Sequence, residues 1–446
     1  MMYQKYDTYK DSGVQWLGNI PNDWEVVRFR DICTFSKGLN ITKENLQDTG
    51  IPCVNYGEVH SKYGFEVSPE RNELKCVSED YLKSSPKSLL AYGDFIFADT
   101  SEDIDGSGNF TYLNSHVMTF AGYHTVIVRP KSYINVRYLA YVFDSLSFRH
   151  QIRTAVKGVK VYSITKAILK DTTVWLPDLD QQYEIAQFLD QKTTQIDQAI
   201  AIKEQQIALL NERKQIVIQQ AVTKGLDPNV KMKDSGVEWI GEIPEHWFYE
   251  PIKYSLKGII DCEHKTAPFV DEKEYFVVRT SNVKNGKLLH EGAKYTHEKG
   301  YKEWTKRGIP RCGDILLTRE APAGEACLIP NDLKLCLGQR MVWLKVNNDR
   351  MLSQLIIYLI YSTVVRTYID FLSTGSTVLH FNMADIQNIP ILIPPIDEQK
   401  LIVKYLNKLD LDIEGASEKI KLQIQKLKEY KTTLINDAVT GKIKVA

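Results

Sequence analysis

The chain has 446 residues, of which 56 are basic and 56 acidic, so its formal net charge is zero. This length supports two domains of ordinary size with connecting helices, and a hydrophobic content of 43% is enough to build real cores. Because the charges balance, the chain as a whole has no net positive potential that would attract nucleic acid. Any contact with nucleic acid must therefore depend on local basic clusters. No apolar run is long enough to cross a bilayer, and residues 1–13 lack the apolar stretch of a signal peptide, so no membrane partner is expected.

The cysteine pattern favours a reducing compartment. The chain has seven cysteines, an odd number, and none are spaced as Cys-x-x-Cys. We therefore expect neither a disulfide framework nor a zinc site, and we expect a cytoplasmic protein.

The first predicted element is a motif that occurs twice. Residues 10–24 read KDSGVQWLGNIPNDW, and residues 233–247 read KDSGVEWIGEIPEHW, with 10 of 15 positions identical. The separation of 223 residues predicts one unit that has been duplicated. The repeated Trp16 and Trp24, with Trp239 and Trp247, are expected to anchor the chain onto the core of each unit.

The first globular domain is predicted to span residues 1–175. Its side chains that are suited to phosphate and base contacts are Lys37, Asn40, Lys43, Asn55, Tyr56, Lys157, Lys160, Tyr162 and Ser163. Taken singly, each short polar or basic segment that contains these residues is more often a solvated loop. They remain candidate DNA-binding residues.

A long helix is predicted next, within residues 176–229. From Gln181 to Lys224 the chain has no proline or glycine. A stripe with 3–4 spacing runs along it, through Leu189, Thr193, Ile196, Ile200, Lys203, Ile207, Leu210, Lys214, Val217 and Ala221. About 40 residues make a rod of about 60 Å. Asp180 is the expected N-cap, and Gly225 with Pro228 is expected to end the helix.

The second globular domain is predicted to span residues 230–392. Its candidate DNA-binding residues are His264, Lys265, Thr266, Arg279, Ser281, Asn282, Arg319, Arg340, Ser376, Thr377 and His380. Residues 157–163 and 374–380 occupy equivalent turns, which raises the odds for this pair. Elsewhere the two domains diverge, by drift or because they recognise different things, and the sequence leaves both readings open.

The last element, residues 393–446, repeats the long helix at a shift of 217 residues. Its stripe is Leu406, Asp410, Ile413, Ser417, Ile420, Ile424, Leu427, Lys431, Leu434 and Ala438, and Asp397 is the expected N-cap. A seven-residue period buries a narrow seam against a partner helix. The polar seam positions weaken it and are expected to set register. Pairing with another copy of the chain stays possible, but pairing within the chain is favoured.

These elements predict an α+β protein. Two α/β recognition domains would be separated by two long antiparallel helices that form a coiled coil, with an internal pseudo-two-fold repeat. Parallel pairing would crowd the two domains together.

Catalytic signatures are missing from the sequence. It has no Gly-x-x-x-x-Gly-Lys-Ser/Thr loop for nucleotide phosphates and no Asn/Asp-Pro-Pro-aromatic segment of the kind that amino-methyltransferases use. The run Asp261-Cys-Glu-His-Lys265 is too compressed for a metal-dependent nuclease, and no metal site is predicted.

The duplicated motif at residues 11–24 and 234–247, each followed by a globular portion and by Pro-x-x-Asp/Glu-Gln opening a long helix, resembles the specificity subunit of type I restriction–modification systems. Residues 261–268 also resemble a stretch near the start of such recognition domains. The resemblance spans nearly the whole chain.

The resemblance implies a noncatalytic, sequence-specific subunit of a prokaryotic cytoplasmic complex. It would read a bipartite, asymmetric target in double-stranded DNA. Two methyltransferase subunits would use S-adenosylmethionine to methylate adenine N6, and restriction subunits would use ATP and magnesium, whereas this chain would bind no cofactor. A paired-module scaffold for proteins, and the recognition portion of a self-sufficient nuclease or methylase, remain alternatives.

Overall fold

The computed structural model describes residues 3–131, 133–158, 161–373 and 381–445. Its contacts divide the chain into two compact units. Unit 1 contains residues 1–203 and 421–446, and unit 2 contains residues 204–420. The predicted domain ranges do not coincide with these units, because each unit includes about half of each long helix.

Unit 1 is built on two sheets covered by short helices. The first sheet has strand order β4-β13-β9-β11-β6, and the second has order β7-β5-β12-β8. The strands are β1 (Tyr9–Asp11), β2 (Asn19–Pro21), β3 (Glu25–Arg28), β4 (Cys33–Lys37), β5 (Ile51–Val54), β6 (Phe65–Val67), β7 (Cys76–Val77), β8 (Leu89–Leu90), β9 (Phe95–Ala98), β10 (Thr100–Ser101), β11 (Phe110–Leu113), β12 (Thr119–Ala121), β13 (Thr125–Pro130), β14 (Tyr162–Ser163) and β15 (Thr173–Leu176). The short helices are α1 (Phe29–Ile32), η1 (Lys43–Asn45), η2 (Glu58–Lys62), α2 (Tyr81–Ser84), η3 (Pro86–Ser88), α3 (Val136–Asp144), α4 (Leu146–Ala155) and α5 (Lys166–Asp171).

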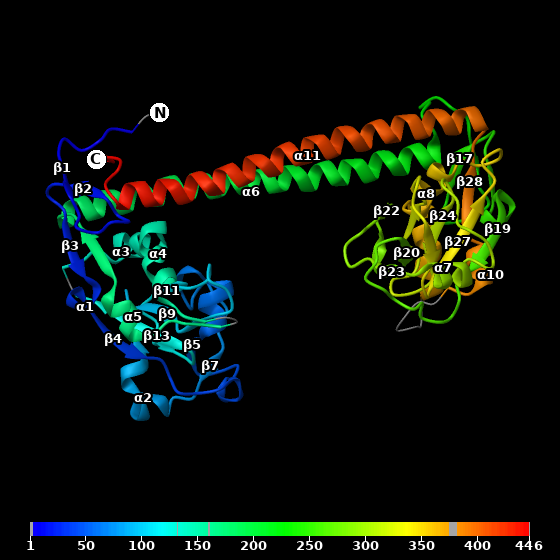
Figure 1. Ribbon diagram of the computed structural model, residues 1–446. Coiled ribbons are helices and arrows are strands. Elements are labelled where there is room, and N and C mark those ends of the chain that lie inside the picture. Colours follow the sequence, from blue (N-terminus) through cyan, green and yellow to red (C-terminus); the bar gives the residue numbers. More distant parts are fainter. Residues whose placement is uncertain (1–2, 132, 159–160, 374–380, 446) are drawn as a thin grey trace. The chain divides into compact units, whose positions relative to one another are not determined.

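The core of unit 1 is aromatic. Phe143 of α3 packs against Phe95, Phe97 and Phe110 of the first sheet, with ring centroids 4.8 to 5.7 Å apart. Helices α3 and α4 therefore lie between this sheet and the long helix α6 (Figure 1). Aromatic rings bury a large apolar area each and make a small core stable.

Unit 2 repeats this plan. One sheet has the order β19-β27-β24-β25 and the other β23-β20-β26. Its strands are β16 (Met232–Asp234), β17 (Glu242–Pro244), β18 (Phe248–Pro251), β19 (Leu256–Asp261), β20 (Tyr275–Val278), β21 (Val283–Lys284), β22 (Lys287–Leu288), β23 (Lys294–Thr296), β24 (Ile315–Thr318), β25 (Ala326–Leu328), β26 (Leu335–Leu337), β27 (Met341–Val346) and β28 (Pro390–Ile393). Its short helices are η4 (Ile252–Ser255), η5 (Thr280–Asn282), α7 (Glu298–Trp304), α8 (Ser353–Ile360), α9 (Thr363–Ser373) and α10 (Met383–Gln387).

The two long helices are α6 (Leu179–Lys224) and α11 (Ile396–Val439). In unit 1 they run antiparallel, because Asp197 bonds Lys431 while Lys203, six residues further on, bonds Gln423, eight residues back. In unit 2 Lys214 pairs with Asp410 at 3.0 Å, and a Cβ on Gly225 would lie 2.9 Å from Glu398, which again indicates opposite directions. The predicted antiparallel pairing within the chain is confirmed.

The predicted seam is also the less exposed stripe of each helix. At the helix ends it is buried, as at Leu189, Ala221, Leu406 and Ala438. Its middle, including Ile207 and Leu210, is half-buried. Two helices alone cannot enclose their seam fully, whereas the ends also pack on α3 or α8.

The N-cap predictions were wrong. Helix α6 begins at Leu179, and Asp178 accepts a hydrogen bond from the Gln181 backbone at 2.8 Å, so Asp178 is the cap and Asp180 lies in the first turn. Helix α11 begins at Ile396, which places Asp397 inside the helix. Each helix therefore begins two residues earlier than a cap at Asp180 or Asp397 would place it. Gly225 does end α6, with φ of +76°.

One glutamine near the start of each long helix fastens that helix to its unit. Gln182 accepts from the Asn135 backbone at 3.0 Å and donates to the Pro177 carbonyl at 2.9 Å. Gln399 accepts from the Leu352 backbone at 2.9 Å and donates to the Pro394 carbonyl at 2.8 Å. These equivalent bonds hold the globular part of each unit in a set orientation on its own helix segment.

The repeated tryptophans anchor the chain, as predicted. Trp24 and Trp247 are fully buried, and their indole N–H groups donate to Gln181 and Glu398, both at 3.0 Å. Trp239 donates to the Val364 carbonyl at 3.2 Å. The matched motif is therefore a structural frame.

Candidate nucleic-acid interface

In unit 2, candidate residues from four segments gather around the turn between β26 and β27. The turn consists of residues 338–340. It borders a cavity of about 380 Å³ lined by Thr266, Ala267, Phe269, Val277, Arg279, Thr280, Ser281, Gly338, Gln339 and Arg340. A second, smaller cavity is lined by His264, Arg319, Glu320, Gln339 and Arg340. The structure thus brings six of the predicted residues to one turn.

Arg340 lies at the tip of this turn. Its φ is +68°, which an arginine adopts only under local constraint. Its Nε lies 2.9 Å from Glu320, and the side chain remains 54% exposed. The guanidinium is therefore held in place and still reaches solvent.

Arg319 lies beneath the turn instead of on the surface. It is buried, and it donates to Asp261 at 2.7 Å and to the Phe381 carbonyl at 3.0 Å. Asp261 also lies 3.2 Å from His264. Asp261, which resembled part of a nuclease set, instead holds the buried Arg319 under the turn and contacts the exposed His264.

Lys265 and Ser281 are exposed, as a DNA-contacting residue must be. Asn282 is not. It is fully buried, accepts from the Arg279 backbone at 3.1 Å and donates to the Leu289 and Glu291 carbonyls. Its side chain shapes the loop that presents Arg279 and Ser281.

Unit 1 has an equivalent turn between β12 and β13, at residues 122–124. His124 occupies the place of Arg340, with φ of +54°, and its Nδ1 lies 3.1 Å from Asp99. Gly122 is required here, because a Cβ would lie 1.9 Å from the Asn55 amide oxygen. Asn55 is buried and bonds the Cys53 carbonyl, so it too faces inward.

Backbone hydrogen bonds show that the two turns are built alike. Asp99 donates from its backbone to the His124 carbonyl at 3.1 Å, and Arg319 donates to the Arg340 carbonyl at 2.8 Å. The next layer also matches, since Ile164 donates to Asp99 at 2.8 Å and Phe381 donates to Arg319 at 2.9 Å. The same backbone therefore carries different side chains in the two units.

Most of the other described candidates of unit 1 are exposed, and two of their segments contact the turn or the strand beside it. Lys37, Asn40 and Lys43 are exposed on a segment whose Leu39 donates to the Ala121 carbonyl at 2.8 Å. Strand β14, with Tyr162 and Ser163, pairs with β10 directly after Asp99. Lys157 is exposed. Lys160, Ser376, Thr377 and His380 lie outside the described residues.

Tyr56 is half-buried, and its ring stacks on His60 with centroids 5.1 Å apart. Burial raises the pKa of Tyr56, and the nearby carboxylates Glu102, Asp103 and Asp99 raise it further. Unit 1 therefore presents acidic groups near its turn, where unit 2 presents arginines. A search for basic clusters in the sequence misses His124 and Asp99. A Gly-x-x segment recurs directly before strands β13 and β27, at residues 122–124 and 338–340, and this recurrence could have located the turn.

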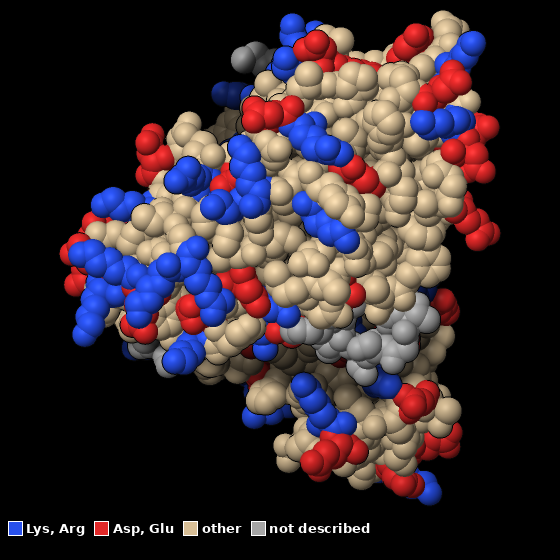
Figure 2. Space-filling view, turned by 90° about the vertical axis from the view of Figure 1, so that its right-hand side faces the viewer, with Lys and Arg blue, Asp and Glu red and all other residues tan. Residues whose placement is uncertain are grey.

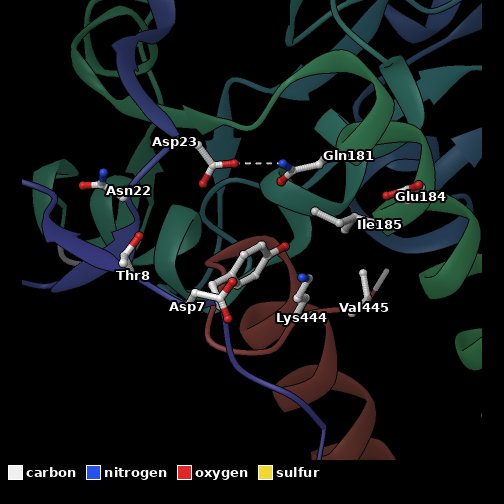
Figure 3. A pocket seen from close by; sticks show the side chains of 10 residues that line it. Asp7, Thr8, Asn22, Asp23, Gln181, Glu184, Ile185, Lys444 and Val445 are labelled. Carbon is white, nitrogen blue, oxygen red and sulfur yellow. Dashed lines mark hydrogen bonds between the residues drawn. The ribbon is translucent and has the colours of Figure 1, made fainter.

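Another cavity, of about 530 Å³, lies in unit 1 where the two chain ends meet (Figure 3). Its lining comes from Tyr6, Asp7 and Thr8, from Asn22 and Asp23, from the start of α6 and from Lys444 and Val445. Gln181 donates to Asp23 at 2.8 Å across it. Burial raises the pKa of Tyr6 to about 12, and Asp23 adds to that effect. This cavity belongs to the frame and contains none of the predicted reading residues.

The charge on the surface is mixed. Figure 2 shows lysine and arginine side chains interspersed with acidic ones, with a denser basic group along one edge. Within the described residues, no group of three or more His, Cys, Asp or Glu side chains is arranged to hold a metal ion. In the same part of the chain, no single helix is long and apolar enough to span a bilayer; α8 and α9 together would be, but they are bent by 57°.

Comparison with known proteins identifies the family. A family model described as the type I restriction modification DNA specificity domain matches residues 21–212 and again residues 253–426. A Methanocaldococcus jannaschii protein, provisionally named the type I restriction enzyme MjaX specificity subunit, is 26% identical over 450 residues, covering 100% of this chain and 99% of its own length. The EcoKI specificity subunit of Escherichia coli K12 is 20% identical, covering 96% of this chain and 90% of its own length.

Solved structures share the fold. A chain from a study of complex assembly and conformational transition in a type I R-M system superposes with a TM-score of 0.70 at 15% identity, over 94% of this chain and 98% of that one. The HsdS subunit from Thermoanaerobacter tengcongensis superposes with a TM-score of 0.52, also at 15% identity, over 95% and 98% of the two chains. Because the family model matches twice and covers most of the sequence, the chain belongs to the family of type I restriction modification DNA specificity proteins.

Proposed function

We propose that this chain is the DNA-recognition subunit of a type I restriction–modification complex. The observation that carries the proposal is one backbone turn, built with corresponding hydrogen bonds in two units of a specificity-family chain, with different side chains at its tip. A shared frame with unlike tips suits two readers of unlike half-sites. The target is therefore bipartite and asymmetric.

Each unit binds its half-site through two kinds of contact. Exposed basic side chains such as Lys37, Lys43 and Lys265 bind phosphates and set orientation, while the turn reads base edges. Each wrong base pair costs roughly 1–3 kcal/mol. Two units in one chain make the second engagement effectively intramolecular, which raises affinity only at correctly spaced targets.

The chemistry belongs to partner subunits. Methyltransferase subunits that bind S-adenosylmethionine methylate adenine N6, and restriction subunits use ATP and magnesium, in the cytoplasm of a prokaryote. The specificity chain is noncatalytic and binds no cofactor in this scheme. The names of the MjaX and EcoKI relatives as specificity subunits support this division.

The length of the helices sets the unread spacer, because α6 and α11 each continue from one unit into the other. A matched one-turn insertion, near Ile207 in α6 and near Ser417 in α11, should change the number of unread base pairs. The bases read should stay the same, since both turns are untouched. Mapping of methylated sites measures both quantities, and an insertion that altered the bases while keeping the spacer would refute this role of the helices.

The proposed function is tested by expressing the full chain with a type I methyltransferase subunit from the same source organism, in a host that lacks adenine methylation. Sequencing that detects N6-methyladenine should reveal one bipartite, asymmetric motif that disappears when this chain is omitted. Copurification of the methyltransferase with the chain is expected as well. The proposal would be contradicted by methylation without a sequence motif, or by a motif that persists when this chain is omitted. Binding of S-adenosylmethionine by the purified chain alone would contradict its noncatalytic role.

A further inference from the structure

The two turns combine a constrained backbone with an accessible side chain. Arg340 and His124 both have positive φ although neither is glycine, at +68° and +54°. Glycine would adopt this conformation without strain, so a side chain is retained here at an energetic cost. Both side chains are also mainly exposed, at 54% and 60%.

Anchoring residues of the structural frame are the same in the two units, whereas the residues at the tips of the two turns differ. Frame positions keep their chemistry, since Trp24 matches Trp247, and Gln182 matches Gln399. The tips do not, since histidine stands opposite arginine, and the carboxylate that holds each comes from a different position. Glu320 holds Arg340, and Asp99 holds His124.

We propose, on the basis of the proposed function, that residues 340 and 124 are the equivalent base-reading positions of the two units, and that Arg340 reads a guanine. A guanidinium that approaches a guanine edge donates two parallel hydrogen bonds to O6 and N7 in the major groove. Glu320 contacts Arg340 through Nε, and the side chain is 54% exposed, so its terminal nitrogens are accessible to a base edge. Being fixed beforehand, the arginine loses little rotamer entropy on binding.

His124 offers a different pattern. The Asp99 carboxylate only accepts hydrogen bonds, so Nδ1 carries the proton toward it. In the neutral ring Nε2 is then an acceptor. Position 124 therefore selects a base with an amino group in the major groove, which is adenine or cytosine.

The experiment uses the full chain assembled with its methyltransferase. The motif is mapped in cells, and binding is measured on DNA pools in which each position is varied. Arg340→Gln should weaken binding to the guanine-containing site by roughly 5- to 150-fold and relax that single position. The other half-site should keep its sequence. His124→Gln should alter only that other half-site.

Matched variants separate reading from general effects. Lys265→Gln removes an exposed cation from the same unit and should weaken binding evenly across sequences, with a smaller salt dependence. Arg340→Lys keeps the positive charge but loses the pair of parallel N–H donors, so it should give an intermediate loss of binding affinity at the same base position. If the DNA motif of the Arg340→Gln complex keeps the sequence of the other half-site, the variant is folded.

Several outcomes overturn the inference while leaving the proposed function standing. These are a wild-type motif without guanine in either half-site, an Arg340→Gln motif identical to wild type, and a loss as uniform as that of Lys265→Gln. If the wild-type complex has no motif, the proposed function fails as well.

Discussion

At the scale of single residues, a few polar side chains decide how each recognition domain is held. Tyr141 bonds Asp190 at 2.6 Å and Thr193 at 3.2 Å on α6. The equivalent Tyr358 bonds Asn407 at 2.9 Å and Asp410 at 2.8 Å on α11. Of the polar seam positions that sequence analysis assigned to register, Thr193 and Asp410 thus bond a tyrosine of their own domain. Lys203 and Lys431 instead pair with Gln423 and Asp197 on the other long helix, and these bonds offset the cost of burying polar groups.

Gln399 should be a strong stability determinant. Gln399→Leu leaves the Leu352 N–H and the Arg350 and Pro394 carbonyls without their partner, and should lower the free energy of unfolding by roughly 1–3 kcal/mol. Gln206→Leu, on the exposed face of α6, should change it by less than about 0.5 kcal/mol. Denaturant titration compares the two, and equal effects would contradict the fastening role.

Two glycines should respond in opposite directions to alanine. Gly415 lies inside α11 with nothing near its missing Cβ, so Gly415→Ala should raise stability by about 0.5–1 kcal/mol. Gly441 has φ of +70°, and a Cβ there would lie 2.3 Å from the Pro21 ring, so Gly441→Ala should lower stability by more than about 1 kcal/mol. Thermal unfolding measures both, and a stabilising Gly441→Ala would show that the turn tolerates a side chain.

At the scale of elements, the helix pair is held mainly at its ends. The ends of the seam are buried against α3, α4, α8 and α9, whereas the middle is half-buried and carries paired charges. One example is the Lys214–Asp410 pair at 3.0 Å. Exposed or half-exposed ion pairs contribute little, so apolar packing near the domains supplies most of the stability.

Leu434 and Leu422 of α11 test this view. Leu434 is 3% exposed and Leu422 is 51% exposed, and both belong to unit 1. Leu434→Ala should cost roughly 2–5 kcal/mol, because it removes apolar contacts and leaves a cavity. Leu422→Ala should cost less than about 0.5 kcal/mol. Hydrogen exchange along α11 reports the local effect, and similar exchange rates in the two variants would refute packing at the end as the source of stability.

At the scale of the whole molecule, the two ends of the chain complete unit 1. Gln4 and Lys444 form a β-bridge, and the Tyr9 hydroxyl donates to the Gly441 carbonyl at 3.0 Å. Trp175 donates to the Val439 carbonyl. In unit 2 the corresponding connection is covalent, since α6 runs through residues 225–231 into β16. The segments at the two chain ends are therefore joined by noncovalent contacts in unit 1, whereas the equivalent segments of unit 2 are joined by a covalent linker.

A circular permutant should fold. Joining the two ends by a short flexible linker and opening the chain between Asp227 and Pro228 exchanges the covalent and noncovalent connections, so the melting temperature should stay within a few degrees of wild type. As a control, a permutant opened between Lys203 and Glu204 interrupts α6 and should be much less stable. If both permutants unfolded alike, the contacts at the chain ends would not be what completes unit 1.

Most of the frame was predictable from the sequence. Repetition of fifteen residues revealed the duplication, and the seven-residue period predicted two long helices, because both signals depend on residues that are neighbours along the chain. The antiparallel direction was predicted because parallel pairing would crowd the two domains together. The helix starts were misplaced by a few residues, since Asp178, Asp180 and Asp397 are equally suitable caps until the backbone geometry is known.

The reading turn depended on tertiary structure. Arg340 was predicted as one basic residue among many, and His124 was not predicted at all. Asn55, Asn282 and Arg319 looked like contact residues but are buried. Local patterns report which residues pair along a helix or strand, whereas exposure at a turn depends on segments more than 60 residues apart, such as Arg319 and Phe381, being brought together by packing. For that reason the sequence by itself determined the duplicated architecture and the family, and only the folded structure decided which side chains stand at the tip of each unit.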